Sequence, residues 1–393
     1  MEPVVRAIFT TTEYKGVNIC SAEIPSIDIT NRPCYYRGTG KTKGSYVRVG
    51  DADLPMTDYE IYSFESYKAH VHDDERPIDR ADLSLLDEAS INNYILQMKL
   101  NRPYFSKLSE KQIYELLSIT RNGIPTLASV LNFGIYPQGL LPQLAITATV
   151  IPGTEIGETT NDGVRFLDNK RIEGTLSEML DEAIAFCNRN MRTQTIIDQN
   201  TGKRNDKTEY PINAIREAII NALIHRDYSI HTEGTTIQIS FFTNRLEIHS
   251  PGSLYGRMTV NDLGKARPNL RNPALATMSE FLLKTENRYS GISTIRREMK
   301  EYGLPEPLFE NKRNEFVVTL FNKTESPIDD IHDNTDLITF CKTPRTRQEI
   351  SDYLDLKTVY FVTKKYIQPL VNQGKLKLLY PDKPKSKNQK YYS

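Results

Sequence analysis

Residues 211–228 read PINAIREAIINALIHRDY, and this stretch decides the fold of the middle of the chain. Its apolar and polar positions recur with the period of an α-helix, so the pattern predicts a helix that begins after Pro211. Glu217, Asn221 and His225 follow one another at intervals of four residues and therefore form one polar stripe. The opposite side of the helix is apolar and consists of Ile212, Ile215, Ile219, Ala222 and Leu223.

The polar stripe is flanked by Ile220 and Ile224, so we expect it to face away from open water. A partly buried carboxylate beside a carboxamide needs a partner, because an unpaired buried charge is costly. A hydrated magnesium ion with phosphates, or a held water molecule, would supply that partner. The alternative is that Glu217 pairs with a nearby arginine while Asn221 caps a loop, and periodicity alone favours this simpler interpretation.

The residues that follow the helix favour a binding site. Residues 235–242 (TTIQISFF) alternate as a β-strand does, and residues 245–249 (RLEIH) are typical of its hairpin partner. Ser250, Pro251 and Gly252 then predict a turn at which glycine admits a close backbone approach.

The order of a Glu-x3-Asn helix, a β-hairpin and a glycine turn resembles that of the GHKL-type ATPases. More specifically, the chain resembles bacterial RecG-related transcriptional regulators, which join a Schlafen/AlbA-like N-terminal domain to a divergent GHKL-like ATPase domain. The resemblance covers most of the chain. It is carried by residues 216–228 (REAIINALIHRDY), 247–254 (EIHSPGSL), 270–276 (LRNPALA) and 286–295 (ENRYSGISTI).

This resemblance implies a site for ATP and Mg²⁺. Glu217 would be the catalytic residue that orients or deprotonates the attacking water, and Asn221 would coordinate the magnesium ion that bridges the phosphates. The resemblance also implies contacts between the nucleotide and Asn221, Ser250, Gly252, Arg271, Ser290 and Gly291.

Two residues depart from the GHKL pattern. Ser250 stands where these proteins usually place an aspartate that accepts the adenine amino proton, and Tyr289 stands at the start of a usual Gly-x-Gly. We therefore expect weaker ATP binding than in typical members, and weak Mg²⁺-dependent hydrolysis at most.

Length and composition set the frame for this interpretation. The 393 residues suit two or three domains, and 38% hydrophobic with 25% charged residues are typical of a soluble globular protein. The sequence contains no apolar run long enough for a transmembrane helix or a signal-peptide core, so we expect a cytoplasmic protein without a membrane partner. The four cysteines form no CxxC pair, which argues against a zinc site and a disulfide scaffold.

The net charge of zero hides a strongly basic C-terminus. From Lys357 onward there are nine lysines and one aspartate, a net charge of +8. A helix over 346–353, a second over 358–373 and a basic β-wing over 376–392 have the order of a winged helix. We expect this segment to bind duplex DNA through Lys364, Lys365, Lys375, Lys377, Lys385 and Lys387. The alternatives are a solvated lysine-rich tail and a winged helix that mediates dimerisation.

The whole chain is predicted to be an α+β multidomain protein with a GHKL-like α/β sandwich core. The opening half of the AlbA-like domain is missing, so either this variant is short or the start is late. Strands are expected at 144–151, 163–168 and 315–321, helices at 175–190, 270–283 and 290–302, and a loop that could act as a lid at 253–269. The predicted regions are a partial AlbA/Schlafen-like region (1–75), a helical and αβ connecting region (76–195), the GHKL-like domain (196–323), an acidic linker (324–336) and the winged helix (337–393).

Three short stretches resemble known functional motifs but lack residues that those motifs require. Gly40-Lys41-Thr42 lacks the first glycine of a Walker loop, since Tyr35 occupies that position, and a hairpin turn is expected there. His225-Arg226-Asp227 lacks the other residues of a kinase catalytic loop. His225 and His231 alone do not make a metal site. A Walker-type helicase is therefore excluded.

Together these patterns predict an ATP-binding, DNA-binding transcriptional regulator with a lid that couples nucleotide state to domain arrangement or to homo-oligomer formation. The alternative is a nucleotide-free DNA-binding or protein-interaction scaffold built on a degenerate ATPase fold.

Overall fold

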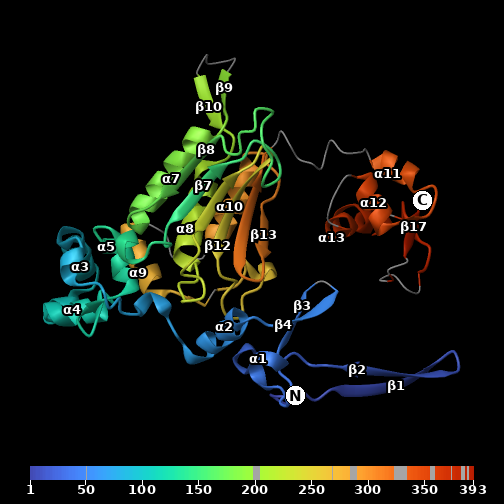
Figure 1. The fold of residues 1–393 in the computed structure, drawn as a ribbon, viewed down its shortest axis with the longest axis horizontal. Helices are drawn as coiled ribbons and strands as arrows, with labels where there is room; N and C mark the ends of the chain where they lie inside the picture. Colours follow the sequence, from blue (N-terminus) through green and yellow to red (C-terminus); the bar gives the residue numbers. More distant parts are fainter. Residues whose placement is uncertain are drawn as a thin grey trace. The chain divides into compact units, whose positions relative to one another are not determined.

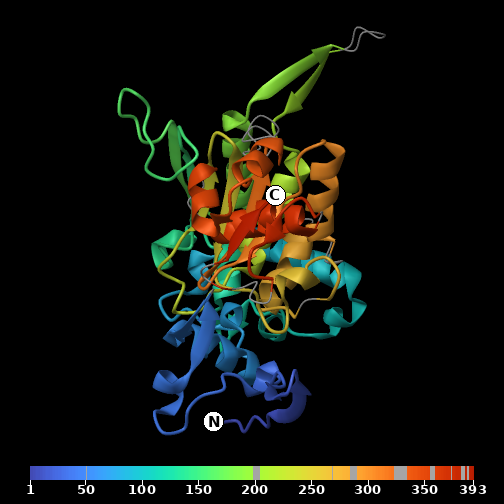
Figure 2. The ribbon, with the colours of Figure 1, turned by 90° about the vertical axis from the view of Figure 1, so that its right-hand side faces the viewer.

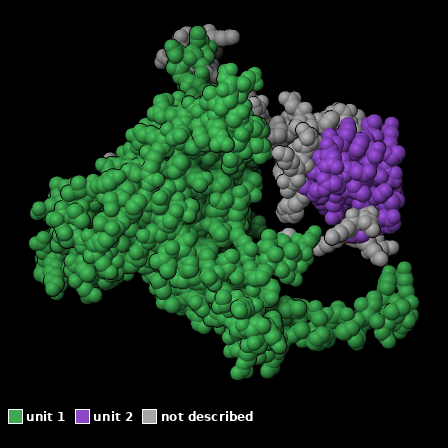
Figure 3. Space-filling model, in the orientation of Figure 1, with its two compact units in different colours: residues 1–322 green, residues 323–393 purple. Residues whose placement is uncertain are grey.

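The computed structural model describes most of the chain: residues 1–49, 51–197, 204–267, 269–283, 290–322, 334–354, 359–372, 374–381, 386 and 389–393. The chain divides into two compact units, Met1–Asn322 and Lys323–Ser393 (Figure 3). Among the described residues no helix is long and apolar enough to cross a bilayer.

A six-stranded mixed sheet forms the centre of the first unit, with the strand order β13-β14-β12-β11-β7-β8. Strand β11 runs parallel to β7, and the other neighbouring strands are antiparallel. Along β12, Leu246 and Ile248 are buried whereas Glu247 and His249 are only half-buried, as alternation requires. The strands are β7 (Ile146–Val150), β8 (Asp168–Ile172), β11 (Ile237–Phe241), β12 (Arg245–Pro251), β13 (Leu308–Asn311) and β14 (Glu315–Phe321).

Helix α8 (Ile212–His225) lies against this sheet and confirms the helix predicted from residues 211–228 (Figure 1). It packs against β12 and against helices α7 (Leu176–Asn190) and α10 (Gly291–Glu301). Ile215, Ile219 and the other residues of its apolar side are buried, with Ile212 partly so. Packing thus fixes the apolar side of α8, and the polar stripe of Glu217, Asn221 and His225 lies on a different side of the helix.

A helical layer continues the core beyond the sheet. Helix α5 (Leu127–Phe133) is buried along its whole length and contacts α9 (Pro273–Leu282). The remaining elements of this layer are η2 (Asp73–Glu75), η3 (Leu83–Leu85), α3 (Glu88–Asn101), η4 (Pro103–Lys107), α4 (Glu110–Leu116), β5 (Thr120–Arg121), β6 (Ile124–Pro125), α6 (Pro137–Leu140) and, after β12, η5 (Val260–Asp262).

The N-terminal region consists of small elements followed by helix α2 (Asp58–Ala69). A capping box between Thr57 and Glu60 stabilises the start of this helix. Outside the N-terminal region, an exposed ribbon of two strands, β9 (Thr193–Ile197) and β10 (Arg204–Thr208), projects from the sheet domain (Figure 2). The other elements of the N-terminal region are β1 (Ile8–Tyr14), β2 (Val17–Glu23), η1 (Ile29–Asn31), α1 (Gly40–Gly44), β3 (Tyr46–Val49) and β4 (Ala52–Pro55).

The second unit has its own small core around a three-stranded sheet, β15-β17-β16. Within residues 359–372 of this unit, Val362, Tyr366, Ile367 and Leu370 are buried and belong to that core. The elements are α11 (Asn334–Phe340), β15 (Arg345–Thr346), α12 (Arg347–Tyr353), α13 (Val359–Val362), a π-helical turn (Thr363–Ile367), α14 (Gln368–Asn372), β16 (Lys377–Leu378) and β17 (Lys390–Tyr392).

An α+β chain is therefore confirmed in this coarse form, and three local expectations were wrong. The strand expected at 163–168 begins only at Asp168, because β8 pairs with β7 from that residue onward. Gly40–Gly44 is a short helix instead of a hairpin turn. Ser250 and Pro251 extend β12, since they pair with Phe316 and Glu315, so the chain turns only at Gly252. The predicted acidic linker lies almost wholly outside the described residues.

Candidate functional site

A cavity of about 180 Å³ opens between α8, α10, the strands β12 and β14, and the segment that follows β12. All of Glu217, Asn221, Ser250, Gly252, Arg271, Ser290 and Gly291 line it, so the fold brings together every residue predicted to contact ATP and Mg²⁺. Their roles stay predictions.

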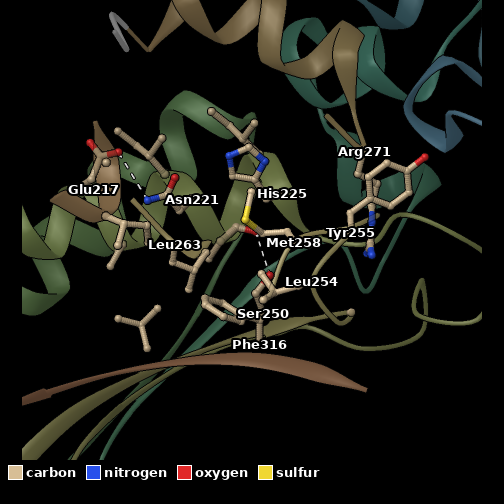
Figure 4. Close-up of a pocket in the computed structure, with 18 of the residues that line it drawn as sticks. Glu217, Asn221, His225, Ser250, Leu254, Tyr255, Met258, Leu263, Arg271 and Phe316 are labelled. Carbon is tan, nitrogen blue, oxygen red and sulfur yellow. Dashed lines mark hydrogen bonds between the residues drawn. The ribbon is translucent and has the colours of Figure 1, made fainter. Parts of the chain in front are cut away.

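One end of the cavity is polar and is formed by the stripe on α8 (Figure 4). Asn221 Nδ2 lies 3.5 Å from Glu217 Oε1, to which it donates a hydrogen bond. Burial raises the pKa of Glu217, although the charge of Arg216 and the Asn221 amide oppose that change. The carboxylate predicted for water activation is thus kept dry enough to take up a proton more readily than an exposed glutamate.

The start of α10 closes the same end. A Cβ on Gly291 would lie 2.1 Å from Glu217 Oε1 and 3.0 Å from Asn221 Nδ2, so only glycine leaves room for these two side-chain ends where they lie. Ser290, Gly291 and Ile292 line the cavity here. The first N–H groups of a helix have no acceptor within it, so this end of the cavity adjoins the positive end of a helix dipole.

The opposite end is anchored by a buried ion pair. Arg271 Nη1 lies 2.8 Å from Asp227 Oδ2, and each side chain is only 6% exposed. Burial acts to raise the pKa of Asp227, but Arg271 and the donors around it hold that pKa below its usual value. The guanidinium also lies 5.1 Å from the centre of the Tyr255 ring, as in a cation–π contact (Figure 4).

Gly252 has a role at this end that the sequence did not indicate. Its φ is +105°, and a Cβ would meet the Asp227 Cβ at 2.4 Å and Arg271 Nη1 at 2.6 Å. The glycine therefore allows the chain to turn directly over the ion pair. Arg271 and Gly252 therefore have a structural role beside Asp227, and their contact with ATP stays a prediction.

Two polar side chains lie between the ends. Ser250 is buried and donates its hydroxyl to the Ala222 carbonyl at 3.1 Å, so its oxygen can still accept a hydrogen bond but carries no charge. His225 is exposed and lines the cavity. The surrounding protein and the charge of Arg271 lower its pKa. No role was predicted for His225, although its position in the polar stripe with Glu217 and Asn221 could have indicated that it lines the cavity.

The rest of the lining is mostly apolar, and apart from Ile220 and Ile224, which flank the stripe, it was not predicted residue by residue. It includes side chains from both strands and from the segment after β12, which the sequence marked only as a lid. Periodicity on β12 and β14 could have indicated those from the strands; no local pattern indicates those from the segment. These residues are Ile220, Ile224, Ile248, Leu254, Met258, Leu263, Leu270, Phe316 and Val318.

The predicted DNA-contacting lysines are only partly described. Lys375 and Lys377 lie at the surface of the second unit, and both are exposed. The side chains of Lys364, Lys365, Lys385 and Lys387 lie outside what the structure describes.

Two family models match this chain. Residues 234–320 match "Putative ATP-dependent DNA helicase recG C-terminal", and residues 335–392 match "Filamentation induced by cAMP protein Fic-like, C-terminal domain". The first match shows an ATPase-like domain related to the RecG C-terminal family. It spans β11, β12, α9, α10, β13 and β14 but begins after α8.

Among solved structures, the DIP2311 protein from Corynebacterium diphtheriae is similar at 18% identity and a TM-score of 0.48. The likeness covers 94% of this chain and 71% of that one. No curated protein sequence matches the chain.

Proposed function

We propose that the first unit binds ATP in the cavity between α8, α10 and the sheet. The observation that supports this proposal is that Glu217, Asn221 and the start of α10 meet at one end of a cavity whose walls are mostly apolar. Free N–H donors at a helix start suit an anionic phosphate, while apolar walls suit a base. The match of residues 234–320 to an ATPase-like family supports the same ligand.

Magnesium fits this arrangement as a companion of the nucleotide. Among the described residues no group of three or more His, Cys, Asp or Glu side chains could hold a metal ion by itself. Mg²⁺ commonly takes few protein ligands and several oxygens from phosphates and water. The Asn221 amide nitrogen is turned to Glu217, which leaves its carbonyl oxygen for such a role. When bound, the ion would neutralise charge on the phosphates.

Glu217 is the residue that would act on water at this end. A carboxylate near its normal pKa is a weak base, and burial raises the pKa of Glu217, which makes it a better one. Its hydrogen bond with Asn221 fixes the direction of one carboxylate oxygen. We propose that orientation of water is its main contribution and that turnover is slow.

Isothermal titration of the full chain with a non-hydrolysable ATP analogue and Mg²⁺ tests the site. Wild type should bind, and Asn221→Ala should weaken binding at least tenfold. Asn213→Ala is the matched control, since Asn213 is an exposed residue of the same helix outside the cavity. Absence of binding heat in wild type would overturn the proposal and favour the nucleotide-free scaffold.

The second unit is proposed to bind duplex DNA, so that the chain acts as an ATP-responsive regulator. The supporting observation is the +8 charge from Lys357 onward, with Lys375 and Lys377 exposed on a folded unit. Lysines at a surface bind the phosphate backbone, release counterions and confer strong salt dependence.

A further inference from the structure

The wall of the cavity formed by residues 252–256 has a second side, which faces helix α2. Tyr59 of α2 is buried, and its hydroxyl donates to Asp227 Oδ2 at 3.1 Å while it accepts from the Ser253 N–H at 3.0 Å. The Ser253 carbonyl in turn accepts from Arg271 Nη2 at 2.8 Å. Both backbone polar groups of Ser253 are therefore fixed, one by α2 and one by the ion pair.

A second tyrosine of α2 supports the next part of the wall. The Tyr67 ring lies edge-on to the Tyr255 ring, with 5.3 Å between centroids and 79° between planes. Gly256 has a φ of +66°, and a Cβ there would lie 2.7 Å from Tyr67 Cε2. The Tyr255 ring thus contacts both the Tyr67 ring and the Arg271 guanidinium.

Polar contacts tie the same region to α2 and its neighbours. Arg313, in the turn between β13 and β14, donates to both carboxylate oxygens of Glu60 at 2.8 Å. Arg257, just past the wall, pairs with Asp28 beside η1 at 2.8 Å. The N-terminal region therefore contacts the wall along its length and at the strand turn beside it.

From these contacts we infer that Tyr59 and Tyr67 are positioning residues of the ligand cavity, so that ligand binding and the docking of the N-terminal region are energetically coupled. Neither tyrosine lines the cavity, but each holds residues that do, namely Ser253 and Tyr255. A ligand that binds only the ordered wall must stabilise the docked state of α2 by the same factor by which docking raises affinity. The nucleotide part of this inference rests on the proposed ATP site; the positioning part does not.

Hydrogen exchange of the full chain tests the positioning part without any ligand. Tyr59→Phe removes the acceptor of the Ser253 N–H, so exchange at residues 253–257 should accelerate about tenfold, the usual effect of one lost hydrogen bond. Tyr67→Leu should also accelerate hydrogen exchange at residues 253–257. Tyr62→Phe is the matched control, because its hydroxyl bonds to Asp73 and does not reach the wall.

Titration with the ATP analogue and Mg²⁺ tests the coupling. Tyr59→Phe and Tyr67→Leu should weaken binding about three- to tenfold, and the ligand should slow exchange in α2 of wild type. Equal exchange in Tyr59→Phe and Tyr62→Phe would overturn the inference, as would unchanged affinity in both wall variants. If wild type binds no nucleotide but Tyr59→Phe still accelerates exchange, the ATP proposal fails while the positioning role stands.

Discussion

The Glu217 carboxylate lies directly over Gly291, at a distance that leaves no room for a methyl group between them. The catalytic candidate on α8 therefore depends on the first residue of α10, although 74 positions separate the two in sequence. This contact places a carboxylate at the positive end of α10, where a phosphate would otherwise be favoured. A bound nucleotide must share that end with Glu217 or move it.

Gly291→Ala should leave the protein folded but disturb the site. Alanine favours a helix over glycine by up to about 1 kcal/mol, and the obstructing atom is the end of a flexible side chain. Glu217 can therefore swing aside, and thermal unfolding should change little while the affinity for ATP and any turnover fall. Gly234→Ala is the matched control, since a Cβ there meets nothing within 4 Å. Equal nucleotide binding in both variants would refute a role for this contact.

Glu217→Gln should separate stability from activity. Burial raises the pKa of Glu217 above its value in the unfolded chain, so the ionised form costs folding free energy, and stability falls as pH rises past about 4.5. The glutamine variant should therefore be more stable than wild type at pH 7, with the difference vanishing near pH 4. Urea unfolding at both pH values measures it. Any ATP turnover should drop by about 100-fold.

The buried pair of Asp227 and Arg271 should couple strongly in a double-mutant cycle. Asp227→Asn leaves the Arg271 charge without its partner, and Arg271→Met leaves Asp227 unpaired, so each single change should cost about 3–5 kcal/mol. The double variant should cost clearly less than the two combined. Urea midpoints of the full chain give the coupling, and strict additivity would contradict the assignment of this pair as the anchor of the cavity.

The sequence predicted the elements that carry strong local patterns. Helix α8 was identified from periodicity alone, because Ile215 and Ile219 repeat on the side opposite Glu217 and Asn221. The placement of Ser290 and Gly291 beside that stripe came only from the family resemblance, since no local pattern joins two distant helices.

What the sequence could not supply is the set of contacts between distant segments. Tyr59 reaches Asp227 across 168 positions, and nothing near Tyr59 marks it as part of a cavity wall. Gly252 was predicted to contact the nucleotide, and the structure shows that it also allows the chain to pass over Asp227. The sequence could not indicate this second contact, because a glycine that permits a close approach looks the same whichever group it approaches.

His249 should make the free energy of unfolding depend on pH. Its Nε2 lies 2.9 Å from Glu247 and its Nδ1 lies 3.1 Å from Glu315. Burial acts to lower the pKa of His249, but the two carboxylates prevail and raise it. Arg245 and Lys312 also pair with these glutamates, which limits their effect on the imidazole.

The sign of this effect follows from the raised pKa. The charged imidazole contributes stability that is fully present below about pH 6.5 and is lost as pH rises through the folded pKa. Urea unfolding of wild type should therefore show a decline between pH 6 and pH 8 that His249→Gln lacks. A decline of the same size in the variant would assign the effect to another group, such as Asp74, whose pKa burial raises to about 7.

Charge removal at Lys375 and Lys377 should identify the DNA-binding face of the second unit. Each phosphate contact contributes about one unit to the slope of log affinity against log salt concentration, so Lys375→Gln with Lys377→Gln should reduce that slope by about two. Lys342→Gln is the matched control, because Lys342 is exposed on the same unit but precedes the lysine-rich segment. Fluorescence anisotropy with a mixed-sequence duplex over a salt series measures the slopes. An unchanged slope in the double variant, or an equal loss in Lys342→Gln, would show that these lysines are only solvated surface, as a lysine-rich tail would be.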